Sequence, residues 1–277
     1  MSFAKPSTLP GDHLMLRFAA NLTTMYTEYP FMERFAHAAH DGFHGVEFLF
    51  PYEHPPEAIA EELRRHRLEQ VLFNAPPGDW SAGERGIASL PGREEEFREG
   101  FLRALHYAGI LRCPRIHVMA GVPPAEIEHA HAVDLFRTNL VWALEASSGT
   151  AIDLLTEPIN SRDIPGYLFS RQEEAHRLVR EIGNRRLKVQ MDLYHCQIME
   201  GDLIMRLRRY LGEEESPVGH IQIAGVPARR EPDEGEVHYE NIFQTLEQLG
   251  YPGWIGCEYK PSAGTSEGLG WFRRYRA

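Results

Sequence analysis

The sequence predicts a single α/β domain over residues 1–277, folded as a closed (β/α)8 TIM barrel. Short apolar runs, typical of strands buried on both faces, alternate with longer segments whose apolar residues recur at helical spacing. Eight such pairs follow one another, and this alternation favours a parallel sheet. The length of 277 residues also suits one such barrel, which typically needs about 250.

The first four strand–helix pairs follow a start, residues 1–12, that we expect to be flexible. Pro30 suits the first turn of the first helix, and Gly42 suits its end. The expected strands are residues 14–21, 45–50, 71–75 and 116–120, and the expected helices are 30–40, 57–67, 94–111 and 124–146. A Gly- and Pro-rich loop, residues 76–92, has the length of a lid or binding loop, although its composition fits a surface insert equally well.

The second half of the chain predicts four more pairs. Ser170 with Glu173 three residues later predicts a capping box at the start of one helix, and Gly250 suits the end of another. The expected strands are residues 151–157, 187–192, 218–224 and 254–258, and the expected helices are 170–182, 202–211, 240–249 and 269–275.

Charge and composition exclude several classes of partner. The formal net charge of −11 argues against binding to nucleic acid or to an anionic membrane, which requires clustered Lys and Arg. We find no apolar core of a signal peptide and no apolar run approaching the ~20 residues of a membrane helix. The three widely spaced cysteines offer neither a zinc pattern nor a disulfide framework. We therefore expect a cytoplasmic protein. The sequence does not give the oligomeric state, and a homo-oligomer is possible.

Four polar residues lie near the ends of the last four predicted strands: Glu157, Asp192, Gln222 and Glu258. A carboxylate in an apolar strand is rare because burying an unpaired charge is costly. In a (β/α)8 barrel these strands are neighbours, and active sites lie at their carboxyl ends, so the four side chains can converge. A hard divalent cation such as Mg²⁺ or Mn²⁺ is the simplest shared partner for these oxygens. The alternative is four unrelated strand ends that open into solvent.

A metal site of this kind predicts a class of chemistry. The ion can hold a carbonyl and a neighbouring hydroxyl oxygen of a substrate, acidify the adjacent C–H and stabilise the resulting enediolate. Glu157 and Glu258 could flank the substrate, one removing the proton and the other returning it. Such chemistry is aldose–ketose isomerisation, or epimerisation if the proton returns to the same carbon on the opposite face.

Other polar residues at this end of the barrel are candidates for binding substrate. His195 lies three residues after Asp192 and could donate to a substrate oxygen, although it could equally cap a helix. Arg229, in the loop after the seventh strand, could pair with a carboxylate, although a loop arginine is usually only solvated. The full set of candidates is His195, Arg229, Lys260, His117 and Asn74, with Asn21 and Glu47 as further residues able to line the cavity.

Several motifs along nearly the whole chain carry a family resemblance. They are FAANL at 18–22, FMERF at 31–35, GVEFLFPY at 45–52, FNAPPGDW at 73–80, TEPIN at 156–160, QMDLYH at 190–195, GHIQIAG at 219–225 and GCEYKP at 256–261. With these motifs the chain resembles the hydroxypyruvate isomerase family, within the xylose-isomerase-like barrels.

The resemblance implies a divalent-metal isomerase that interconverts two small acids, hydroxypyruvate and tartronate semialdehyde. It places the metal ligands at Glu157, Asp192, Gln222 and Glu258, the proton-transferring pair at the two glutamates, and substrate contacts at His195 and Arg229. Similar scaffolds include 2-oxotetronate isomerases and ketose 3-epimerases. The epimerases typically have a histidine as third ligand, so Gln222 favours the hydroxypyruvate branch. The resemblance does not separate a three-carbon from a four-carbon acid, because both carry the same reacting groups.

Two further classes of protein remain as alternatives. A metal-dependent endonuclease on a similar barrel would need a basic surface, which the net charge of −11 opposes. A non-catalytic protein that binds metal or acid on a decayed barrel is disfavoured, because all four candidate ligands are present.

Overall fold

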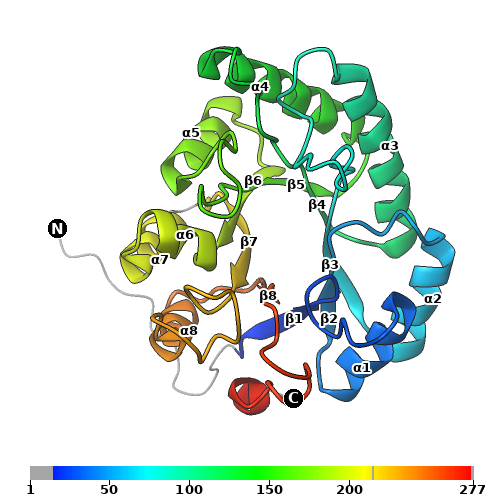
Figure 1. The fold of residues 1–277 in the computed structure, drawn as a ribbon, viewed down its shortest axis with the longest axis vertical. Helices are drawn as coiled ribbons and strands as arrows, with labels where there is room; N and C mark the ends of the chain where they lie inside the picture. The colour runs from blue at the N-terminus through cyan, green and yellow to red at the C-terminus, as the bar shows by residue number, and fades with distance from the viewer. Residues whose placement is uncertain (1–14, 214, 276–277) are drawn as a thin grey trace.

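Eight parallel strands pair in sequence order and close into a barrel in the computed structural model, which describes residues 15–213 and 215–275. Each strand pairs with the next one along the chain, and β8 returns to β1 with Trp254 opposite Arg17. Figure 1 shows the ring of strands with the helices arranged around its outside. The predicted (β/α)8 barrel is therefore confirmed. Residues 1–12, expected to be flexible, lie outside the described residues.

The strands are short and occupy the predicted order. They are β1 (Arg17–Asn21), β2 (Gly45–Glu47), β3 (Glu69–Asn74), β4 (Arg115–His117), β5 (Asp153–Thr156), β6 (Leu187–Asp192), β7 (Val218–Ile223) and β8 (Trp254–Cys257). Several end earlier than predicted, so that Glu157 and Glu258 lie just past their strands rather than within them. Both side chains nevertheless leave the backbone at the carboxyl end of the barrel.

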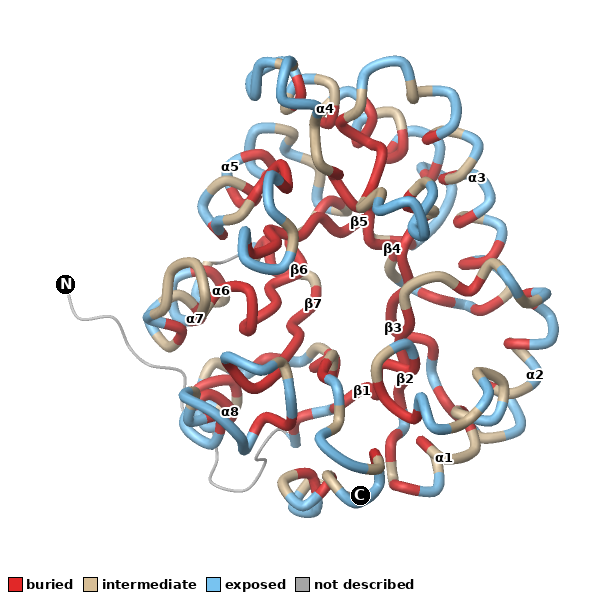
Figure 2. Tube along the Cα trace, in the orientation of Figure 1, coloured by how far each residue is buried: buried red, intermediate tan, exposed pale blue. Residues whose placement is uncertain are grey.

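The helices cover the outer face of the barrel. They are η1 (Phe31–Glu33), α1 (Arg34–His40), α2 (Pro56–His66), α3 (Glu94–Leu111), α4 (His129–Ala146), α5 (Gln172–Ile182), α6 (Leu193–Met199), α7 (Leu203–Leu211), α8 (Tyr239–Gln248) and η2 (Trp271–Tyr275). Figure 2 shows the strands buried around the ring and the outward sides of the helices exposed. Each helix thus contributes one apolar face to the core between it and the strands.

Two local predictions were wrong, and one short helix was missed. The helix expected at residue 124 begins at His129, because Pro124 to Ile127 form a turn and Glu128 has an extended backbone. The capping box lies one residue later than expected: the Glu174 carboxylate, not that of Glu173, accepts the backbone N–H of Arg171. The short helix α6, directly after β6, was not predicted, because seven residues are too few to show helical periodicity.

Within the ranges 15–213 and 215–275, no helix is both long and apolar enough to span a bilayer.

Candidate active site and metal centre

The candidate site is a cavity of about 620 Å³ at the carboxyl ends of the strands. The predicted site residues that line it are Asn74, His117, Glu157, His195, Gln222, Arg229, Glu258 and Lys260. Asp192 is fully buried beside them, with its Oδ2 atom 3.5 Å from both His195 Nε2 and Arg229 Nη2. The fold therefore brings all nine predicted residues to one place. Asn21 and Glu47 also line the cavity, as expected.

Glu157 is a buried carboxyl with little local compensation. Its Oε1 atom has no hydrogen-bond partner within the described part of the chain. The nearest imidazole nitrogens, from His195 and His117, lie 3.8 Å from its two oxygens, too far for good hydrogen bonds. Burial, with the nearby carboxylates of Asp192 and Glu258, raises the pKa of Glu157 well above its usual range. The Oε1 atom of Glu157 is therefore suited to bind a proton or a cation.

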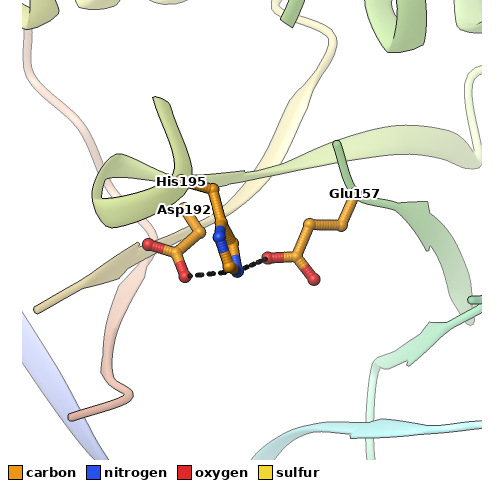
Figure 3. A group of neighbouring side chains, drawn as sticks. All are labelled: Glu157, Asp192 and His195. Atoms are coloured by element: carbon orange, nitrogen blue, oxygen red, sulfur yellow. Dashed lines mark ion pairs between the residues drawn. The ribbon is translucent and has the colours of Figure 1, made fainter. Parts of the chain in front are cut away.

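Asp192 ends β6 and begins α6. Its Oδ1 atom accepts the backbone N–H of Tyr194 at 2.8 Å, which satisfies one of the free N–H groups at the helix start. Burial raises the pKa of Asp192 to about 6, and the cationic Arg229 opposes the shift. One side-chain atom each from Asp192, Glu157 and His195 lie within 4.8 Å of one another, which is close enough to surround one metal ion. Figure 3 shows the three side chains pointing toward one another.

His195 is better placed to donate a hydrogen bond than to ligate a metal. The Oδ1 atom of Asn160 accepts the backbone N–H groups of Arg162 and Asp163, so the Nδ2 group of Asn160 must point the other way. That group lies 2.6 Å from Nδ1 of His195, which is therefore the acceptor of this bond. In the neutral imidazole the hydrogen is then on Nε2, facing Glu157 and Asp192. Burial lowers the pKa of His195 well below its usual range, which favours this neutral form.

Glu258 lies between a cation and an amide. Its Oε1 atom is 2.7 Å from Nη2 of Arg229, and its Oε2 atom accepts from Nε2 of Gln222 at 2.7 Å. Burial raises the pKa of Glu258 to about 7, a shift that Arg229 opposes. Arg229 itself has a left-handed backbone, with φ at 54°, and its guanidinium lies 4.9 Å from the ring centre of Tyr194. A non-glycine residue held in this conformation is often found at a functional site.

The remaining predicted residues surround this centre. His117 is buried, and neither of its ring nitrogens has a partner among residues 15–213 and 215–275. Burial lowers the pKa of His117 to about 3, so the ring is neutral and can bond a substrate oxygen. Lys260 is exposed at the cavity, and its backbone N–H donates to the carbonyl of Arg229 at 2.8 Å. This bond ties the loops after β7 and β8 together.

The donor atoms fit a hard divalent ion. Three carboxylates and the amide group of Gln222 lie at one end of the barrel, and oxygen is the ligand that Mg²⁺ and Mn²⁺ prefer. The unpartnered Oε1 atom of Glu157 is a buried acceptor that such an ion would satisfy. The residues that could hold a metal are therefore Glu157, Asp192, Gln222 and Glu258.

Sequence reasoning missed several residues that line the cavity. The loop at 76–92 contributes Trp80 and Arg85, whose guanidinium carbon lies 4.0 Å from the Trp80 ring centre. Tyr194 and Asp163 also line it, and both contact Arg229. The only sequence signal for Tyr194 was its place in the QMDLYH motif, whereas no spacing or periodicity indicated Asp163 or Arg85.

Comparisons with known proteins agree with this architecture. Residues 35–275 match the model of the family described as xylose isomerase-like TIM barrel. The chain is 53% identical to a 2-oxo-tetronate isomerase of Cupriavidus necator, over 94% of this chain and 99% of that protein. It is 44% identical to a hydroxypyruvate isomerase of Escherichia coli, over 95% of this chain and 100% of that one.

A solved structure described as an AP endonuclease, family 2, from Brucella melitensis superposes with a TM-score of 0.91. It is 49% identical and covers 95% of this chain and 100% of that one. The family match spans well over half of the chain, and the curated relatives align over nearly all of it. This chain therefore belongs to the xylose isomerase-like TIM barrel family.

Proposed function

We propose that this protein is a divalent-metal-dependent isomerase that interconverts hydroxypyruvate and tartronate semialdehyde. The observation that carries the proposal is the pair Glu157 and Glu258, two carboxyls that face one cavity from β5 and β8, each with its pKa raised by burial. A carboxyl whose pKa is about 7, like that of Glu258, can both accept and return a proton near neutral pH. Relatives named hydroxypyruvate isomerase and 2-oxo-tetronate isomerase support this class of reaction.

The metal would be held by the carboxylates of Glu157, Asp192 and Glu258 and by the amide oxygen of Gln222. When bound, a divalent ion polarises the substrate carbonyl and so acidifies the neighbouring C–H. His195 and His117, both neutral, are placed to hydrogen-bond the substrate oxygens.

The proton transfer between the two carbons needs only the two glutamates. One carboxylate removes a proton from the hydroxyl-bearing carbon of hydroxypyruvate, leaving an enediolate on the substrate. A proton is then delivered to the adjacent carbon. The hydroxyl proton moves from the original alcohol oxygen, which becomes the new carbonyl, to the original carbonyl oxygen, which becomes the new hydroxyl. The net change moves hydrogen from one carbon to the next without any oxidant or reductant. Which of Glu157 and Glu258 acts first depends on the direction of reaction.

The substrate carboxylate would be bound by cations at the cavity. Arg229 offers a planar guanidinium and Lys260 an ammonium, and both line the cavity. Neutral sugars have no group to pair with these cations, which disfavours ketose 3-epimerisation. A 2-oxotetronate carries the same carboxylate and the same reacting carbons, and the relative at 53% identity favours it as a second candidate substrate.

Solvent deuterium exchange followed by NMR tests the proposal. Protein with Mg²⁺ or Mn²⁺ is offered hydroxypyruvate, a 2-oxotetronate or D-fructose in D₂O, with a chelated sample as control. We expect exchange and new resonances with hydroxypyruvate, abolished by the chelator. Turnover of the 2-oxotetronate alone would reassign the substrate, and turnover of fructose alone would indicate an epimerase. No turnover of any of the three, together with cleavage of abasic DNA, would overturn the proposal in favour of an endonuclease.

A further inference from the structure

A buried carboxylate that the proton transfer does not use lies beneath the candidate metal centre. Glu47, at the end of β2, is 1% exposed and accepts three hydrogen bonds from side chains of other strands. Asn21 Nδ2 donates to its Oε1 at 3.0 Å, Gln222 Nε2 donates to the same oxygen at 2.7 Å, and His220 Nε2 lies 2.7 Å from its Oε2. Side chains from two strands, β1 and β7, thus converge on one carboxylate, and β7 is not a backbone neighbour of β2.

The direction of two of these hydrogen bonds is determined by the surrounding atoms. Asn21 accepts the backbone N–H of Thr23 on its Oδ1 atom at 3.0 Å, so its Nδ2 group must face Glu47. Gln222 faces two carboxylates at once, because its Nε2 group lies 2.7 Å from Glu47 and 2.7 Å from Glu258. An amide oxygen in that position would face two acceptors, which is unfavourable.

This arrangement decides where the oxygen of Gln222 points. With Nε2 directed at Glu47 and Glu258, Oε1 is directed toward β6, where it accepts from Nε2 of Gln190 at 2.6 Å. Strand β6 is also the strand that ends in Asp192. The Gln190 amide also donates to the Glu157 carboxylate, which agrees with its nitrogen facing Oε1 of Gln222. The two carboxylates that accept from Nε2, Glu47 beneath the site and Glu258 within it, are what select this orientation.

The backbone of β8 makes room for this carboxylate. Gly256 pairs with Gln222 of β7, and a Cβ atom at Gly256 would overlap both oxygens of Glu47. Only glycine at this place lets the Glu47 side chain reach across the barrel to β7.

We propose that Glu47 is the positioning residue of the metal centre: it holds the Gln222 amide with its nitrogen toward Glu258 and its oxygen toward β6, the orientation in which Gln222 can offer an oxygen to a divalent ion. Glu47 acts through Gln222 and is not itself one of the proposed metal ligands. The effect of Glu47 on metal binding rests on the proposed metal-dependent function, but the orientation of the Gln222 amide can be measured without metal.

The first test is NMR of the metal-free protein labelled with ¹⁵N at the glutamine side chains. The Gln222 amide signal is assigned by its loss in Gln222→Ala. In the wild type we expect protons that resonate downfield of exposed glutamine amides and exchange slowly with water. In Glu47→Leu the signal should move toward the exposed range and exchange faster. The isosteric Glu47→Gln should shift the Gln222 signal less but in the same direction. This variant replaces Glu47→Leu in the test if the leucine variant does not fold. An unchanged Gln222 signal in folded Glu47→Gln and Glu47→Leu overturns the inference.

The second test is Mn²⁺ affinity measured by titration calorimetry in a double-mutant cycle. Loss of a group that orients a metal ligand typically lowers metal affinity by about 10- to 100-fold. We expect Glu47→Gln to lower the Mn²⁺ affinity by about tenfold. In the Gln222→Ala background the same substitution should change affinity by less than about twofold, because Glu47 then has no ligand to orient. An equal loss in both backgrounds would mean that Glu47 acts by another route, and the inference would be wrong.

A matched control is Asp41→Asn. Asp41 is also a buried carboxylate that accepts two side-chain hydrogen bonds, from Tyr26 and Ser266, but it does not line the cavity. Its variant should keep the wild-type Mn²⁺ affinity. If the wild type binds no Mn²⁺, the metal-dependent part of the proposed function fails, and the NMR measurement still decides whether Glu47 orients Gln222.

Discussion

The Nη2 atom of Arg229 lies 2.7 Å from Oε1 of Glu258 and 3.5 Å from Oδ2 of Asp192. One guanidinium therefore neutralises two of the four residues that we propose as metal ligands. A divalent ion at this place would compete with Arg229 for the same oxygens. The guanidinium that it releases would then be free for the carboxylate of the substrate.

Arg229→Met should separate these two roles. Without the competing cation, we expect Mn²⁺ to bind more tightly by about tenfold, which corresponds to ~1.4 kcal/mol. The KM for hydroxypyruvate should rise by about tenfold or more, because a charge-assisted pair with the substrate is lost. Calorimetry and steady-state kinetics measure the two effects. The control is Arg230→Met, a neighbouring arginine that does not line the cavity, and weaker Mn²⁺ binding in Arg229→Met would contradict the competition.

Glu157→Gln and Glu258→Gln should each lower kcat by about 10²- to 10⁴-fold, the usual contribution of a general acid or base. Glu157→Gln should not lower the stability of the metal-free protein, because a neutral amide replaces a buried carboxyl that is costly to ionise. Deuterium exchange and urea unfolding check both expectations. Asp153→Asn, at the opposite end of β5 from Glu157, is a control that should remain active. Full activity in either glutamine variant would exclude the paired-glutamate mechanism.

The stability of the metal-free protein should fall as pH rises from about 4.5 to about 7. Burial raises the pKa of Glu258 from 4.5 to about 7, and that of Asp192 from 3.8 to about 6. The folded state therefore holds these protons more tightly than the unfolded state does. Their contribution to stability is fully present below the unfolded-state pKa and is lost as pH passes the folded-state pKa.

Urea unfolding in the presence of a chelator, at a series of pH values, measures this slope. Glu258→Gln removes the group with the higher of these two pKa values and should flatten the slope between about pH 6 and 7. A slope that stays the same in this variant would show that Glu258 is not the titrating group.

Gly256→Ala should destabilise the fold by about 1–3 kcal/mol, the usual cost of overpacking a core. The new methyl group would overlap the Glu47 carboxylate, which is held by three hydrogen bonds and cannot withdraw cheaply. The matched control is Gly109→Ala in α3, where nothing lies within 4 Å of the new Cβ atom. That variant should gain about 0.5–1 kcal/mol from helix propensity. Equal stability of the two variants would contradict this account.

Some features of the site could not be predicted because their cause is distant in sequence. Glu47 and Gln222 are 175 residues apart, and their hydrogen bond exists only because the barrel closes. Asn160 sets the tautomer of His195 across 35 residues and two elements. The Trp80 ring under Arg85 lies in a loop whose length suggested a lid or binding loop but whose composition fitted a surface insert equally well, so the sequence did not decide that it lines the cavity.

The order of strands and helices, and the presence of Glu157, Asp192, Gln222 and Glu258 at the strand ends, were determined by the sequence alone. They depend on local periodicity and on the rule that parallel strands present their carboxyl ends on one side. Only the tertiary structure decided which atoms of these residues face one another: the amide direction of Gln222, the imidazole hydrogen of His195 and the place of Arg229 between two carboxylates. These depend on hydrogen bonds between separate strands and loops, whose geometry exists only once the ring of eight strands has closed.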